Sequence, residues 1–158
     1  MMKSKNGFIP KLDKPTEPEI IQMKPDNKWG SGTMAIPTPR MIQKIIRSIP
    51  DGMLITNEMM RNMIASETGA NIACPLTTGI FTNIVAHATE EAIERNIPEE
   101  QVNWWRVIQK DGTLNPKFPG GLAHQAELLE QEGFQIQRKT EKKFIVIGWQ
   151  QYLANLIA

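Results

Sequence analysis

Residues able to act as nucleophiles, proton carriers or metal ligands are few in this chain. Its 158 residues include one cysteine, Cys74, and two histidines, His87 and His124. Cys74 precedes Pro75 at the expected start of a helix, where the helix dipole favours a reactive thiolate. A free cysteine is more often an inert apolar side chain, so a thiol enzyme is kept only as an alternative. The histidines have no cysteine or carboxylate at ligand spacing, and we predict no metal site and no cofactor.

A more specific pattern of polar, glycine and aromatic residues begins at Asn96. Trp104 follows eight residues later, inside the segment Asn103-Trp104-Trp105-Arg106-Val107-Ile108. Then come Asp111-Gly112, Gly120-Gly121-Leu122 and Leu128-Leu129-Glu130-Gln131-Glu132-Gly133. In order and spacing, this series resembles the C-terminal half of the alkylguanine-DNA alkyltransferases, whose pattern runs P-C-H-R-V-[VI], a glycine turn, G-G-L and L-L-x-x-E-G. The resemblance is good over residues 96–133, looser over 38–95 and absent over 1–37.

The resemblance implies a fold but excludes the family's reaction. In the enzymes, the cysteine of the motif accepts the alkyl group, and the adjacent histidine and a downstream glutamate activate it. This chain has Trp104 and Trp105 at the two motif positions. An indole offers an N–H donor and no nucleophilic lone pair, whereas the reaction needs an activated thiolate. We therefore predict that the protein is not an enzyme, and that Asn96 and Glu132 are a structural remnant of the relay.

Tryptophan in place of the cysteine is known in the alkyltransferase-like proteins. These proteins bind alkylated guanine flipped out of the duplex and signal to other repair systems without transferring the group. The resemblance thus implies a non-enzymatic DNA-binding protein that senses alkylated guanine in DNA repair, with double-stranded DNA as its partner.

The resemblance also indicates which residues meet DNA. Ile55-Thr56-Asn57 matches a helix start at which the family has a tyrosine that rotates a phosphate, here Asn57. Asn83 or His87, depending on the register, stands where the family inserts an arginine into the base stack. The predicted DNA- and base-binding residues are Thr56, Asn57, Asn83, His87, Trp104, Trp105, Arg106, Gly120 and Gly121.

Two interpretations stay open for the aromatic pair. Trp104 and Trp105 form either a stacking platform for an extruded base or part of the core, since tryptophan is mostly buried. Arg106 is expected to brace the turn through hydrogen bonds to loop carbonyls.

A second function class is favoured by the distribution of charge. No Arg or Lys occurs between Arg61 and Arg95, and the predicted recognition helix carries Glu90, Glu91 and Glu94. Phosphates are bound mainly by Lys and Arg. The alternative is therefore a protein-interaction or regulatory module that kept the fold and lost DNA binding, with a protein partner in place of DNA. Four basic residues on a predicted turn are candidate phosphate contacts: Arg138, Lys139, Lys142 and Lys143.

Local signals predict the elements that position these residues. Thr38 is a candidate N-cap with Pro39 in the first turn, and isoleucines at helical spacing continue to Ile49. A second helix follows residue 56. A third places Ile80, Phe81, Ile84, Val85, Ala88 and Ala92 inward. A fourth helix opens at Gly120-Gly121, and segments 134–136 and 144–147 pair as strands. The predicted fold is α+β, a small winged helix-turn-helix domain of the alkyltransferase C-terminal type.

Composition and charge exclude several classes of protein. The formal net charge of +1 excludes a histone-like protein held to DNA by bulk charge. No apolar stretch is long enough to span a bilayer and no signal peptide is evident, so we expect a cytoplasmic protein and no membrane partner. Proline-rich residues 1–37 lack apolar periodicity and predict an irregular, largely flexible N-terminal arm. The domain is expected over 38–150, followed by a C-terminal tail over 151–158.

Overall fold

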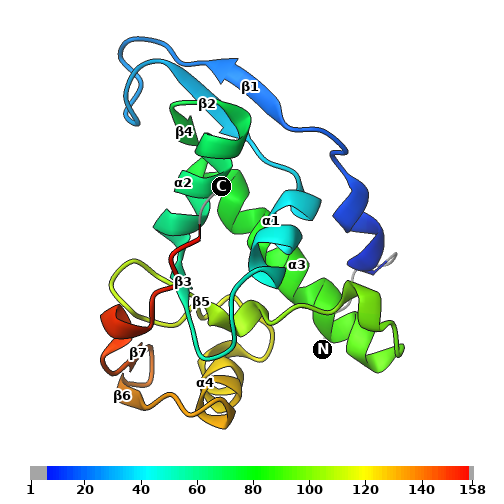
Figure 1. Ribbon diagram of the computed structural model, residues 1–158, viewed down its shortest axis with the longest axis vertical. Coiled ribbons are helices and arrows are strands. Elements are labelled where there is room, and N and C mark those ends of the chain that lie inside the picture. Colours follow the sequence, from blue (N-terminus) through cyan, green and yellow to red (C-terminus); the bar gives the residue numbers. More distant parts are fainter. Residues whose placement is uncertain (1–6, 157–158) are drawn as a thin grey trace.

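A computed structural model describes residues 7–156, which form four α-helices and seven short strands (Figure 1). The helices are α1 Pro39–Arg47, α2 Asn57–Thr68, α3 Pro75–Glu94 and α4 Gly121–Gln131. The strands are β1 Glu19–Gln22, β2 Thr33–Ile36, β3 Ile55–Thr56, β4 Ile72–Ala73, β5 Val107–Ile108, β6 Ile136–Thr140 and β7 Lys143–Val146. Four single 3-10 turns accompany them: η1 Ile9–Asp13, η2 Pro98–Glu100, η3 Trp104–Arg106 and η4 Trp149–Tyr152.

Threonine caps begin the first two helices. Thr38 Oγ1 accepts a hydrogen bond of 3.1 Å from the amide of Met41, and Pro39 occupies the first turn of α1. Thr56 Oγ1 accepts an equivalent bond of 3.1 Å from the amide of Met59 and starts α2. Each cap satisfies an amide that has no partner within the helix. The predicted cap at Thr38 is confirmed.

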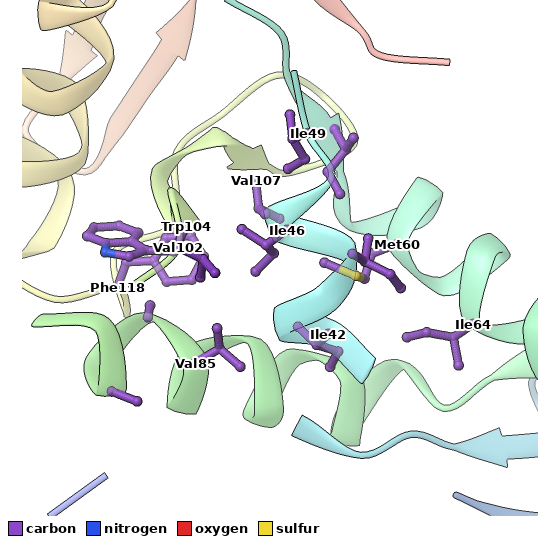
Figure 2. Close-up of a cluster of buried hydrophobic side chains, with 14 of the residues drawn as sticks. Ile42, Ile46, Ile49, Met60, Ile64, Val85, Val102, Trp104, Val107 and Phe118 are labelled. Carbon is purple, nitrogen blue, oxygen red and sulfur yellow. The ribbon is translucent and has the colours of Figure 1, made fainter. Parts of the chain in front are cut away.

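The centre of the molecule is a winged helix-turn-helix. The helices α2 and α3 are joined through a short turn that contains β4, and α1 packs against α3 (Figure 1). Strands β6 and β7 form the antiparallel wing. Figure 2 shows the main hydrophobic cluster, in which side chains of α1, α2 and α3 meet the segment around Trp104. A second cluster, with Leu54, Ile108, Leu129 and Val146, joins α4 to the wing. The predicted α+β winged helix-turn-helix fold is confirmed.

The prediction of an irregular, flexible arm over residues 1–37 is wrong for the described part, which starts at Gly7. Strands β1 and β2 form an antiparallel hairpin, and β2 pairs in parallel with β4. Leu12 in η1 is completely buried in the main cluster. The carboxylate of Glu91 in α3 accepts hydrogen bonds of 2.8 Å from the amide of Phe8 and 3.2 Å from that of Ile9. The arm is therefore a structural layer over α1 and α3; residues 1–6 lie outside the described residues.

The predicted C-terminal tail over 151–158 is also ordered as far as residue 156. Leu153 pairs with Leu54, and the amide of Ala154 donates to the Leu54 carbonyl at 2.8 Å. These bonds form a backbone bridge at the residue before β3, beside the two-stranded β3–β5 sheet. The remaining two residues, 157–158, lie outside the described residues. Within the described part, no helix is long and apolar enough to cross a membrane.

The face of α3 that points inward differs from the predicted one at Ile80, which is 48% exposed. Three threonines of α3, Thr78, Thr82 and Thr89, are buried in its place. Thr82 donates its hydroxyl hydrogen to the Thr78 carbonyl at 2.7 Å, and Thr89 Oγ1 accepts from the amide of Val102 at 3.2 Å. The hydroxyls of Thr82 and Thr89 have such partners and are buried at low cost, whereas Thr78 Oγ1 is buried without a partner. Val85, Ala88 and Ala92 are buried as predicted.

We predict that Leu12→Ala lowers the free energy of unfolding by about 2–5 kcal/mol, because it leaves a cavity in the main cluster. Ile20→Ala in β1 is the matched control. That side chain is 48% exposed, and a change within about 0.5 kcal/mol is expected. Urea unfolding of both variants measures the difference. Equal stabilities would mean that the arm does not pack on the core.

Candidate functional site

Trp104 lies at the centre of the motif, and its side chain is completely buried. Its ring centroid is 5.1 Å from that of Phe118, 5.8 Å from that of Trp105 and 6.0 Å from that of His124. Figure 2 shows the indole at the edge of the main cluster beside Phe118. Of the two interpretations left open, the core position is the observed one. With no exposed surface, the ring does not stack on an external base in this conformation.

Glu90 of α3 connects Trp104 to α4. Its Oε2 accepts a hydrogen bond of 3.4 Å from Trp104 Nε1, and its Oε1 lies 2.8 Å from His124 Nε2. Glu90, one of the acidic residues noted on the predicted recognition helix, is turned toward its neighbours in the protein. The sequence offered no signal for this contact, since 34 residues separate Glu90 and His124.

Arg106 is the best connected side chain of the motif, and it is 5% exposed. Its Nη2 lies 2.7 Å from Glu132 Oε1 and 2.9 Å from Asp51 Oδ1, and its Nη1 donates to the Ile49 carbonyl at 3.0 Å. The amide of Asn103, oriented with its oxygen toward the guanidinium, accepts from both Nη atoms. Burial lowers the pKa of Arg106, but the bonds to Glu132 and Asp51 outweigh burial and raise it. Arg106 holds one loop carbonyl and two carboxylates, and it braces the turn as expected.

Glu132 follows the last turn of α4 and accepts hydrogen bonds from both Arg106 and Trp105. Its carboxylate accepts from Arg106 Nε at 2.9 Å and from Trp105 Nε1 at 2.5 Å. Burial raises the pKa of Glu132, and the hydrogen bonds from Arg106 and Trp105 offset this and bring the pKa below its usual value. Both carboxylate oxygens are thus engaged with groups that stabilise the charged form.

Four other residues of the predicted site lie at helix ends or pack against the arm. Thr56 is a buried N-cap, and Asn57 is the first residue of α2. Asn96 is exposed and has a left-handed φ of 57°, which ends α3 together with a 2.9 Å bond from the Ile97 amide to the Ala92 carbonyl. His87 stacks on Phe8 with centroids 4.7 Å apart, and burial lowers its pKa. The arm therefore covers His87.

The two glycines at the start of α4 have φ values of 75° and 72°. A Cβ on Gly120 would lie 2.5 Å from His124 Cβ, whereas one on Gly121 would meet no atom within 4 Å. Gly120 therefore permits the close approach of the loop to α4, and this contact brings His124 beside Trp104.

A groove of about 630 Å³ runs along the N-terminal half of α3. The loop from Gln109 to Lys117 forms its opposite wall, and Lys11 of η1 lies at its edge. Asn83 is the one residue of the predicted site among its lining residues, and its Oδ1 is buried with no hydrogen-bond partner. The full lining is Lys11, Pro75, Leu76, Gly79, Ile80, Asn83, Ile84, Gln109, Asn115, Pro116 and Lys117. Sequence reasoning missed this groove, because its two lysines come from segments far from α3.

Among the described residues, no group of three or more His, Cys, Asp and Glu side chains is placed to hold a metal ion. Cys74 is buried beside Met23 and Met34 in a small apolar cluster.

The helix-turn-helix, the wing and the bonded motif turn define a DNA-binding domain fold of the alkyltransferase type. The family model for the DNA binding domain of 6-O-methylguanine DNA methyltransferase matches residues 37–134, and the chain belongs to this family. Two solved structures are similar: S. pombe Atl1 in complex with damaged DNA containing O6-carboxymethylguanine, and S. pombe ATL in complex with DNA. Each is 21% identical, has a TM-score of 0.53, and aligns over 75% of this chain and 94% of its own. No curated protein sequence matches.

We predict that Glu132→Gln lowers the free energy of unfolding at pH 7 by about 3 kcal/mol, because it leaves the Arg106 guanidinium buried without its main counter-charge. The pKa of Glu132 is lowered by folding. Its contribution is therefore present above the unfolded pKa of about 4.3 and is lost as the pH falls through the folded value. Urea unfolding between pH 7 and pH 3 should show the two stability curves converging at acid pH. Glu127→Gln, on the exposed side of α4, is the control and should follow the wild type at every pH.

Proposed function

We propose that this protein is a non-enzymatic, alkyltransferase-like DNA-binding protein that senses alkylated guanine for DNA repair. One observation carries the proposal. At the positions of the family's nucleophile and its neighbour stand Trp104 and Trp105, both held by carboxylates, Glu90 and Glu132. Family membership supports DNA as the partner. The similar S. pombe Atl1 structure contains DNA with O6-carboxymethylguanine, which supports a lesion of that class.

The absence of alkyl transfer follows from the side chains at the motif. Transfer requires a thiolate with a hydrogen-bonded base beside it, and both indoles are N–H donors without a nucleophilic lone pair. Cys74, the one cysteine of the chain, packs against Met23 and Met34 and does not line the groove. Glu132, which would polarise the relay in an enzyme, is fully engaged by Arg106 and Trp105.

The groove along α3 is the place we assign to the extruded nucleotide. Trp104 and Phe118 are buried in the main cluster and do not line the groove, so the base is not received on the Trp104 ring. Asn83 Oδ1 is an acceptor without a partner, and the exocyclic amine of guanine is a donor that O6-alkylation leaves intact. Lys11 and Lys117 supply positive charge at the groove, which suits the flanking phosphates.

The second candidate function is a protein-interaction or regulatory module. It is favoured by the absence of Lys and Arg from α3 and by three exposed apolar side chains on that helix, Leu76, Ile80 and Ile93. Such side chains mark protein interfaces as well as nucleic-acid contacts.

Anisotropy of a labelled duplex tests the proposed function. We expect tighter binding to a duplex with one O6-alkylguanine than to the matched guanine duplex, because a damaged base is extruded at lower cost. Lys117→Glu should weaken binding to both duplexes. It should also make the fall of log K with log salt less steep, by about 1 in the slope. Lys44→Glu, an exposed change on α1 outside the groove, is the control. Failure of the wild type to bind either duplex at low salt would contradict DNA binding and favour the protein-interaction module.

A transfer assay tests the absence of enzyme activity. We expect no labelled alkyl group on the protein after incubation with a duplex that carries O6-alkylguanine with a radioactive alkyl carbon. Cys74→Ser should behave like the wild type. Label that appears on the wild type and disappears in Cys74→Ser would instead support a thiol enzyme.

A further inference from the structure

The helix α3 presents apolar side chains to solvent where cations are absent. Leu76 is 64% exposed, more than any other large hydrophobic residue in the described part of the chain, and Ile80, one helical turn later, is 48% exposed. Both line the groove. An exposed pair of this kind has no role in the core, since neither residue belongs to a hydrophobic cluster. An external partner that offers apolar surface would cover them.

Gly79 lies between these two residues and is unexplained by packing within the chain. Its backbone is helical, and a Cβ built on it meets no atom within 4 Å. Glycine destabilises a helix interior relative to alanine, so the fold gains nothing from it here. Without a side chain at this position, a partner can approach the α3 backbone closely at the centre of the groove.

The charges around this ridge favour one class of partner. The groove lining includes two lysines, Lys11 and Lys117, and no Asp or Glu. An apolar ridge with positive charge beside it matches nucleic acid, in which apolar base faces lie between negative phosphates. Other proteins that open the base stack insert Leu, Ile, Met, Phe or Pro side chains between base steps.

We propose that Leu76 and Ile80 form an apolar wedge that enters the DNA base stack at the step opened by the extruded nucleotide, and that Gly79 admits the DNA close to α3. The inference rests on the proposed function and deepens it. It explains how a helix without Lys or Arg contacts DNA: the helix touches base faces, while Lys11 and Lys117 attract the neighbouring phosphates.

The test uses the full chain and a duplex with one O6-alkylguanine next to 2-aminopurine, whose fluorescence rises when it is unstacked. The wild type should bind and raise this fluorescence. Leu76→Ala and Ile80→Ala should each weaken binding about tenfold, on the scale of one lost base contact, and should reduce the fluorescence rise. Leu76→Met, which keeps a flexible apolar side chain, should retain both the affinity and the fluorescence rise of the wild type. Ile93→Ala is the matched control, because Ile93 lies on α3, is also 48% exposed and does not line the groove.

Gly79→Ala separates binding from stability. This variant should have a higher Tm than the wild type and yet bind the alkylated duplex more weakly, which no loss of fold explains. If the wild type binds and Leu76→Ala, Ile80→Ala and Gly79→Ala all bind equally well with the same fluorescence rise, the wedge is wrong although the proposed function stands, and the ridge is left for a protein partner. If the wild type binds no DNA, the proposed function and the wedge are both wrong.

Discussion

One buried guanidinium holds together three segments that are otherwise joined by loops. Arg106 bonds to the Ile49 carbonyl before α2, to Glu132 at the end of α4, and to the Asn103 amide within its own turn. Burying such a charge costs several kcal/mol unless its donors find acceptors. The bonds therefore fix the relative positions of the helix-turn-helix, the motif turn and α4, and the rest of the fold is built on that arrangement.

The same bonds stabilise the turn that holds Trp104 and Trp105. Glu132 accepts from Trp105 as well as from Arg106, so its carboxylate stabilises the turn whatever residue precedes Arg106, provided that residue donates a hydrogen bond. An indole N–H meets this requirement. Trp104 meets a different one: its ring fills space between Phe118 and α3, and Glu90 satisfies its N–H. Two N–H donors of large volume thus keep the interior packed and bonded at these positions.

Local signals in the sequence were sufficient for the helices, but contacts between distant segments were not predictable. Thr38 and Pro39 act within one turn of α1, and they were identified correctly. The arm was misjudged because its order depends on Leu12 and on bonds to Glu91, more than 80 residues away, and neither leaves an apolar period. On α3, the buried threonines shifted the inward face from the one that Ile80 indicated. The burial of Trp104 depends on contacts with Phe118 and His124. The spacing of these residues in the sequence does not predict that they meet.

The position of the arm limits how much of α3 is left for the proposed contact with a duplex. Phe8 and η1 lie over the C-terminal half of α3 through His87 and Glu91, which leaves residues 75–84 along the groove. Ten helical residues extend about 15 Å, and base pairs rise about 3.4 Å each. The part of α3 along the groove is therefore about as long as four base pairs. In the proposed complex, contacts over so short a stretch would depend little on flanking sequence, and selectivity would come from the state of a single base.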